Sequence, residues 1–166
     1  NAVRYYLCVG LNTFDNSSYL EADLIHKWNN DIVKGYGNLM ARVLHLIDLK
    51  QTEIADHLIL QDDRNFVNEF IQKTKDSFEV CEIKYAYNFL KYMITWGDKY
   101  ISDSKPYGKE CENPDQILNG LYYMLYEVSK YYKIIFPNMD YEITSALKNK
   151  KKVILFKSIE HAEQVI

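Results

Sequence analysis

Two polar side chains have the types and spacing needed to recognise a nucleobase. Asn38 and Arg42 are four residues apart, so they share one face of a predicted helix. The asparagine amide offers donors and an acceptor, and the arginine guanidinium presents a planar fork of donors. Together they can bond the edge of one base. On spacing alone, the plainer interpretation, two solvated residues on a helix surface, stays open.

Patterns for catalysis or metal binding are missing from the sequence. Gly35 and Gly37 fall within a predicted helix, not after a strand, so they do not form a phosphate-binding loop. The four histidines share no helical face at metal-ligand spacing, and no Ser-His-Asp or Cys-His arrangement can be argued. Asp62 and Asp63 are expected to be carboxylates at a helix start. The chain by itself is therefore expected to be non-catalytic, with no metal site.

The overall charge limits the ways in which the protein can hold a partner. The formal net charge is −3, which is the wrong sign for gripping nucleic acid by bulk electrostatics. Any RNA contact must be made by a few placed residues, and neither DNA nor a membrane is an expected partner. Three widely spaced cysteines and no apolar run of membrane-spanning length favour a cytoplasmic protein. The chain begins at Asn1 without Met and is expected to be a fragment.

The helices that must position Asn38 and Arg42 can be predicted from apolar spacing. Ser18 and Glu21 match a capping box, which predicts the start of a long helix that runs to about Leu49. Glycine inside a helix costs about 1 kcal/mol relative to alanine. Gly35 and Gly37 are thus expected to allow close approach of a ligand or another backbone, or a helix–helix contact. One buried stripe is predicted along this helix: Ile25, Trp28, Ile32, Tyr36, Leu39, Val43 and Leu46.

Further helices are predicted over residues 63–78, from Cys81 to before Pro106, from Pro114 to Pro137 and over residues 140–148. Phe66 and Phe70 are expected to face inward. The apolar tail, residues 153–159, is expected to form a strand or to pack on the bundle. The sequence thus predicts an all-α bundle of about five helices. Core packing is also expected for an aromatic stripe: Tyr85, Phe89, Tyr92, Trp96 and Tyr100.

Short motifs in the same order along the chain resemble the anticodon-binding domain of methionyl-tRNA synthetases, which are class I aminoacyl-tRNA synthetases. Residues 29–32 (Asn-Asn-Asp-Ile) and 37–42 (Gly-Asn-Leu-Met-Ala-Arg) are similar to the first helix of that domain. Residues 98–101 and 105–107 resemble its Asn-Lys-Tyr-Ile-x-x-x-x-Pro-Trp motif. Similarities over residues 2–7, 121–137 and 155–159 extend the match to nearly the whole chain. Three departures are Asp98, where Asn is common, Ser102, where an acidic residue is common, and Tyr107, where Trp is usual.

The resemblance implies a site and a function. It implies that Asn38, Arg42 and Tyr107 hold the first anticodon base, a cytosine, and that Pro106 shapes the turn. It further implies recognition of the CAU anticodon loop of tRNA(Met) by a methionine–tRNA ligase. The longer enzyme would attach methionine using ATP and Mg²⁺, through signatures that this sequence lacks and that would lie upstream of Asn1. No cofactor is expected in this fragment.

The resemblance also implies a division of the chain. Residues 1–17 would join the bundle to the enzyme's own catalytic domain, residues 18–150 would form the anticodon-binding bundle, and residues 151–166 would form a tail on or near it. Two alternatives stay open. One is the same bundle in an isoleucine, valine, leucine or cysteine synthetase, and the other is a helical protein-interaction module without an RNA role.

Overall fold

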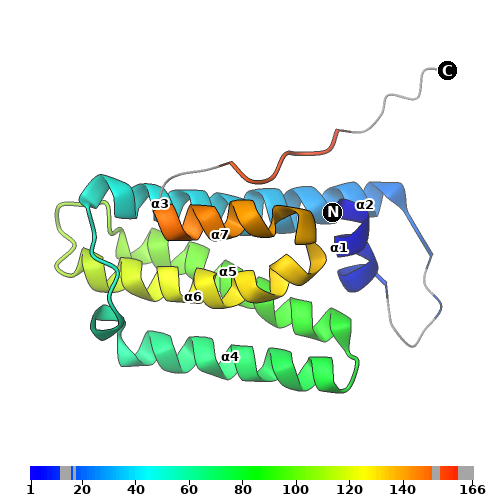
Figure 1. The fold of residues 1–166 in the computed structure, drawn as a ribbon, viewed down its shortest axis with the longest axis horizontal. Coiled ribbons are helices and arrows are strands. Elements are labelled where there is room, and N and C mark those ends of the chain that lie inside the picture. The colour runs from blue at the N-terminus through cyan, green and yellow to red at the C-terminus, as the bar shows by residue number, and fades with distance from the viewer. Residues whose placement is uncertain (12–15, 17, 151–153, 161–166) are drawn as a thin grey trace.

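The computed structural model describes residues 1–11, 16, 18–150 and 154–160, and in these residues it contains helices but no strand. In Figure 1 a long helical rod (residues 21–50) and α7 (Asp140–Asn149) run along the top. Helices α5 (Ile83–Ser104) and α6 (Pro114–Ile135) fill the middle, and α4 (Gln61–Glu79) runs along the bottom. The short helix α1 (Ala2–Val9) closes one end. The predicted all-α bundle is confirmed.

The longest rod is the predicted first helix of the bundle. It consists of α2 (Glu21–Lys27), a π-helical stretch η1 (Trp28–Gly37) and α3 (Asn38–Lys50), which follow one another without a break. All seven residues of the predicted stripe are buried, and Ile32, Tyr36, Leu39 and Val43 are fully so. The apolar spacing therefore correctly identified the face of this rod that enters the core.

The predicted capping box is wrong. The rod begins at Glu21, with Leu20 in an extended conformation at the N-cap and no side-chain cap bond. The residues just before the helix contact α1 instead: the rings of Tyr6 and Tyr19 meet edge-on, with centroids 5.7 Å apart. The Tyr6 hydroxyl also accepts a hydrogen bond from the Leu20 amide at 3.5 Å. The N-cap position is therefore occupied by Leu20, and the Ser18 hydroxyl is not at the helix end.

Two glycines are accommodated inside the rod because neighbouring atoms approach them closely. A Cβ on Gly37 would lie 3.0 Å from the Phe156 ring and 3.1 Å from the Ile32 carbonyl, five residues earlier. A Cβ on Gly35 would lie 3.2 Å from the Asn30 carbonyl, also five residues earlier. In a π-helix the carbonyl of residue i faces residue i+5, so both glycines relieve crowding there. The group that packs against Gly37 is the Phe156 side chain of the C-terminal tail, and not the ligand, backbone or second helix that the sequence suggested.

Helices α4 and α5 pack against each other, and three rings of the aromatic stripe of α5 (Phe89, Tyr92 and Trp96) meet rings of α4 in the seam between them. Phe66 stacks on Trp96 with centroids 4.4 Å apart, and Phe70 stacks on Tyr92 at 4.8 Å. Phe66 and Phe70 are half-buried, whereas Tyr92 is exposed. The core-packing prediction for this stripe is therefore wrong in part. A neighbouring face of α5 enters the core instead, through Ala86, Leu90, Met93, Ile94, Gly97 and Ile101.

The remaining elements match the predicted positions. Helix α6 begins at Pro114 after Asn113, although the Asn113 side chain makes no cap bond, and α7 covers residues 140–149. Two short 3₁₀ turns, η2 (Asp56–Leu58) and η3 (Pro137–Met139), lie in connections. The predicted tail forms no strand over residues 154–160 but packs on the bundle through the buried Phe156. Val153 lies outside the described residues.

The Asp63 carboxyl is buried at the junction of α4, α5 and α6. Its side chain fills the space left by Gly120, where a Cβ would lie only 2.2 Å from the Asp63 Oδ2. The Tyr100 hydroxyl donates a long hydrogen bond to that oxygen, at 3.4 Å. Burial raises the pKa of Asp63 to about 6. The helix-start position was predicted correctly, but the burial was not.

Substituting Asp63→Asn is expected to stabilise the protein at neutral pH. An acid whose pKa is raised by folding binds more protons in the folded than in the unfolded state, so stability falls as pH rises from about 4 to above 6. The amide carries no charge and removes this loss, which predicts a gain of about 3 kcal/mol at pH 8 and little gain at pH 4. Urea unfolding at the two pH values measures it. An equal effect at both would contradict the buried-carboxylate explanation.

Candidate functional site

The predicted base-binding residues Asn38 and Arg42 lie in the first two turns of α3, directly after the π-helical stretch. Asn38 is exposed, and Arg42 is partly exposed with 38% of its side chain accessible. The helical spacing of four places both on one side of α3, beside the buried residues Leu39 and Val43. Both side chains are therefore accessible to a ligand at the same part of the surface.

Arg42 is held by an acidic side chain of another helix. Its Nη1 donates to Oδ1 of Asp98 on α5 at 2.7 Å, and the two side chains are 38% and 39% exposed. Burial raises the pKa of the Asp98 carboxyl, and the adjacent guanidinium opposes that rise. A guanidinium has five N–H donors, so this contact orients the fork of Arg42 without using all of them. The sequence had indicated Asp98 only as a departure from the family pattern.

Pro106 and Tyr107 form a turn directly after α5. Lys105 ends the helix in the left-handed conformation, with φ 45°, and its carbonyl accepts a hydrogen bond from the Gly108 amide at 2.7 Å. Pro106 is buried, which anchors the turn on the bundle, while Tyr107 remains 56% exposed. The phenol ring is thus presented at the surface, where an aromatic face can stack with a planar ligand.

The structure brings the four predicted residues together in two pairs. Asn38 and Arg42 share one face of α3, and Pro106 and Tyr107 share one turn. The Arg42–Asp98 ion pair links α3 to α5, the helix that ends in that turn. Asp98 lies six residues before the end of α5, which is about 9 Å along the helix axis.

Other residues of the matched motifs have structural roles. The Asn29 side chain donates to the Ile159 carbonyl at 2.8 Å and accepts from the Ile159 amide at 2.9 Å, which fixes the tail against η1. Asp31 accepts a hydrogen bond from the Tyr5 hydroxyl at 3.0 Å and pairs with Lys91 at 2.7 Å. The motif at residues 29–32 therefore ties α1, α5 and the tail to the rod that carries Asn38 and Arg42.

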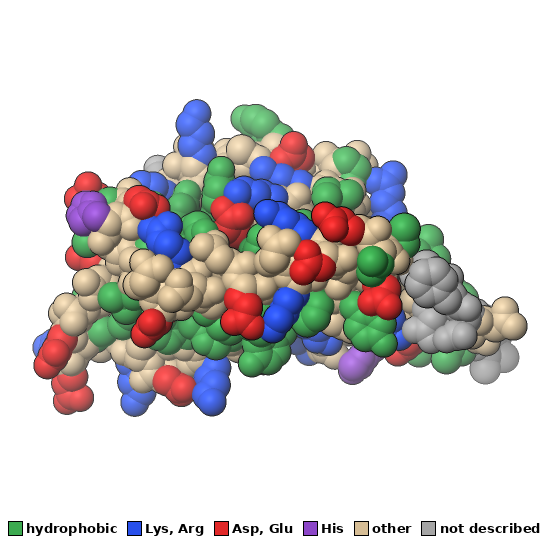
Figure 2. Space-filling view, turned by 90° about the horizontal axis from the view of Figure 1, so that it is seen from below, with side chains coloured by type: hydrophobic (Ala, Val, Ile, Leu, Met, Phe, Trp, Pro, Cys, Tyr) green, Lys and Arg blue, Asp and Glu red, His purple; other side chains and the backbone are tan. Residues whose placement is uncertain are grey.

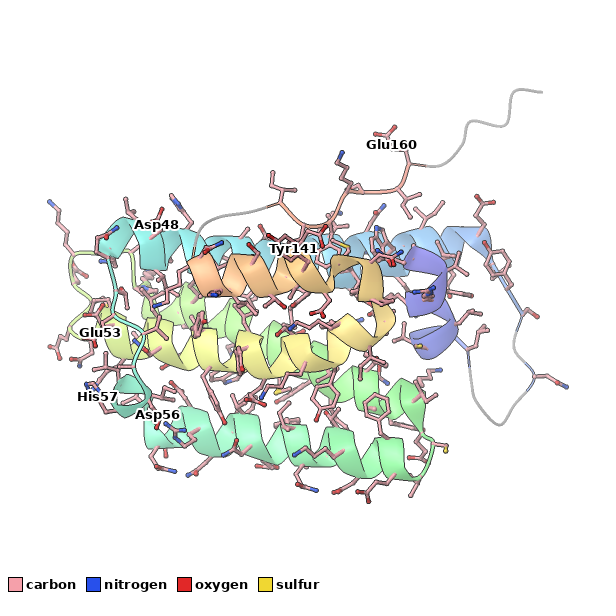
Figure 3. The ribbon with its side chains drawn as sticks, viewed as in Figure 1. Asp48, Glu53, Asp56, His57, Tyr141 and Glu160 are labelled. Atoms are coloured by element: carbon pink, nitrogen blue, oxygen red, sulfur yellow. The ribbon has the colours of Figure 1, made fainter. Side chains whose placement is uncertain are left out.

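The face of the molecule formed by α4 carries charges of both signs. Figure 2, which shows the molecule from the side of α4, has acidic and basic side chains interspersed, without a broad area of one sign. Figure 3 shows Asp48, Glu53 and Asp56 at the end of the bundle where α3 ends. Within the described ranges, no cluster of three His, Cys, Asp or Glu residues suits a metal ion. No described helix is both long and apolar enough to span a membrane.

Comparison with known proteins gives a consistent result. No protein-family model matches the chain. The methionine–tRNA ligase of Ureaplasma parvum is 27% identical over 134 residues, 77% of this chain, and that of Mycoplasmopsis pulmonis is 28% identical over 158 residues, 87% of this chain. The chain spans only 26% and 30% of the lengths of these two relatives.

The fold is likewise that of known synthetase structures. The apo form of Mycobacterium tuberculosis methionyl-tRNA synthetase matches 97% of this chain with a TM-score of 0.81 and 16% identity, and the match covers 39% of that protein. The same enzyme bound to methionyl-adenylate matches 91% with a TM-score of 0.73. Over most of its length, the chain is thus a homologue of part of the methionine–tRNA ligases and has the fold expected of their C-terminal domain.

Proposed function

We propose that this chain is the anticodon-binding domain of a methionine–tRNA ligase and that it selects tRNAs with the anticodon CAU. Asn38 and Arg42 bond the Watson–Crick edge of the first anticodon base, a cytosine. Tyr107 stacks on that base, and Pro106 holds the turn. The observation that carries the proposal is the Arg42–Asp98 pair, at 2.7 Å, which fixes an arginine fork one helical turn from the exposed Asn38.

This mode of recognition agrees with the charge of the protein. Single-stranded RNA is recognised by splaying bases out, stacking them on aromatic rings and bonding their edges. Stacking contributes about 1–3 kcal/mol per base and does not require a broad basic surface. A net charge of −3 therefore does not oppose RNA binding at a small site.

The chemical steps belong, in this proposal, to the rest of a longer enzyme in the cytoplasm. That part would activate methionine with ATP and Mg²⁺ and transfer it to tRNA(Met). The present chain would contribute no catalytic residue and would act on the reaction only by binding the tRNA. Its expected partners are the anticodon loop and the catalytic domain of the same protein.

Substituting Tyr107→Ala in the longer enzyme is expected to raise the KM for tRNA about tenfold, because one stacking contact is lost. Methionine-dependent ATP–pyrophosphate exchange should be unchanged, since that reaction does not involve the anticodon. The matched control is Tyr85→Ala, which removes a tyrosine of similar exposure (58% against 56%) at the opposite end of α5. If both activities fell together, or if neither changed, the role of Tyr107 would be wrong.

A further inference from the structure

The Asp98 carboxylate has one oxygen to spare beside the Arg42 fork. Its Oδ1 accepts the 2.7 Å hydrogen bond from Arg42 Nη1, and within the described part of the chain this is the only hydrogen bond to the Asp98 side chain. Ser102, one turn further along α5, donates its hydroxyl to the Asp98 backbone carbonyl at 2.7 Å, so it does not occupy the carboxylate. With 39% of its side chain exposed, Asp98 can offer Oδ2 to a ligand.

Stability does not account for this ion pair. Both side chains are more than a third exposed. Pairs of that kind contribute little to folding, because water screens the charges and two long side chains lose their freedom. Arg42 is the charged neighbour that opposes the burial-driven rise in the pKa of Asp98. The pair is neutral as a whole, so it adds no net repulsion for the phosphates of an RNA.

An acceptor next to a fork of donors matches the Watson–Crick edge of cytosine. That edge presents the 4-amino donor beside two acceptors, the ring nitrogen and the 2-oxygen. Aspartate and glutamate accept from the 4-amino group of cytosine in protein–nucleic acid complexes. Arg42 keeps several N–H donors besides the one that bonds Asp98, and these suit the two acceptors. The Arg42–Asp98 pair therefore offers a partner for every group on this edge.

Uracil does not fit the same pair. It carries a 4-oxygen in place of the 4-amino group and an N–H in place of the acceptor nitrogen. The Asp98 carboxylate would then face an oxygen, and the guanidinium would face a donor. Such mismatched contacts reject a competitor as effectively as good contacts select the right ligand.

We infer that Asp98 is a specificity-determining residue, which accepts a hydrogen bond from the 4-amino group of the first anticodon base and repels the 4-oxygen of uracil. The inference rests on the proposed function and deepens it. Asn38, Arg42 and Tyr107 hold a pyrimidine, and Asp98 determines which pyrimidine is held. Arg42 and Asp98 act as one unit, since the guanidinium orients the carboxylate, and so the loss of either residue removes the preference for cytosine.

The test combines three bases with one conservative substitution. Fluorescence anisotropy measures binding of the chain to anticodon stem-loops with cytosine, uracil or pyrimidin-2-one, which is cytosine without its 4-amino group, at the first anticodon position. Asp98→Asn keeps the shape of the side chain, but its amide can donate to the 4-oxygen of uracil. The matched control is Asp56→Asn, which makes the same change in the Asp56–Arg64 pair at 2.9 Å. Circular dichroism verifies the fold of both variants.

Wild type is expected to bind the cytosine loop about tenfold more tightly than either other loop, because each lacks the hydrogen bond to a charged group. In Asp98→Asn the cytosine loop should bind about threefold more weakly and the uracil loop about threefold more tightly, which removes the preference. Asp56→Asn should match wild type within about twofold for all three loops. Tighter binding of uracil does not result from a damaged fold or a misplaced Arg42, so it separates base contact from a purely positioning role.

Two results would overturn the inference. One is a wild type that binds the pyrimidin-2-one loop as tightly as the cytosine loop, a comparison that needs no variant. The other is Asp98→Asn weakened equally toward cytosine and uracil, which would mean that Asp98 only holds Arg42. If wild type still prefers cytosine to uracil in these cases, the Asp98 inference alone fails. If wild type binds the uracil loop as tightly as the cytosine loop, the proposed function fails with it.

Discussion

Replacing Arg42 with alanine is expected to weaken binding of a CAU anticodon stem-loop by about a hundredfold, near the upper range for one bidentate base contact. Two effects add. The fork that bonds the base edge is lost, and the Asp98 carboxylate, which lies 2.7 Å from Arg42 Nη1, is left without its cation beside an anionic ligand. Both side chains of the pair are more than a third exposed, so the fold should tolerate the change.

A second arginine offers a matched control. Arg64 on α4 also pairs with an aspartate, Asp56, at 2.9 Å, and its side chain is 25% exposed. Arg64→Ala removes the same charge and the same kind of ion pair elsewhere on the bundle, so RNA affinity should change less than about threefold, the size of a screened long-range charge effect. Equal losses in the two variants would show that Arg42 acts only through net charge.

Replacing Phe156 with alanine is expected to lower the free energy of unfolding by about 3 kcal/mol, the lower range for a buried phenylalanine because the tail can partly collapse. The ring is buried against Trp28, Tyr36 and Phe136, and it lies over Gly37. Its loss also weakens the attachment of the tail that carries Lys157 and Ile159. Urea unfolding followed by helical circular dichroism measures the change.

The control for this variant lies in the same tail. Ile154 is 80% exposed, so Ile154→Ala should change stability by less than about 0.5 kcal/mol. A Phe156→Ala loss no larger than that of Ile154→Ala would mean that the tail does not contribute to the core.

Elements with strong local signals were predictable from the sequence. The apolar stripe from Ile25 to Leu46 has a helical period over nearly six turns, and every member is buried. Asn113-Pro114 marks the start of α6, because proline fits the first helical position and lacks the amide that would go unpaired there. The helix positions followed from such features because they depend on nearby residues alone.

Features that depend on distant residues were missed. The start of the rod is set by Tyr6 contacts across the chain, and not by Ser18. The aromatic stripe of α5 is half-exposed because α4 offers aromatic partners along one seam, while smaller residues of α5 meet the core. The burial of Asp63 requires the space beside Gly120, which lies 57 positions later in the sequence.

The candidate site likewise combines local features, which were predictable from the sequence, with long-range contacts, which were not. Residue type and a spacing of four made Asn38 and Arg42 candidates, although solvated residues on a helix surface have the same features, and both are accessible on α3. The partner of Arg42 was not predicted, because Asp98 is 56 residues away and meets it only through the packing of α3 near α5. The C-terminal tail also lies beside Asn38 through residues 154–156, which are more than a hundred positions away in the sequence, and no local pattern reveals this contact.

The most direct test is a thermodynamic cycle with wild type and Arg42→Ala, each titrated with a CAU stem-loop and with one in which the first base is changed to uracil. Direct contact predicts that the base change weakens wild-type binding at least about tenfold and weakens Arg42→Ala binding less than about threefold. The contradicting result is a base change that costs nothing in wild type, or that costs the same in both proteins.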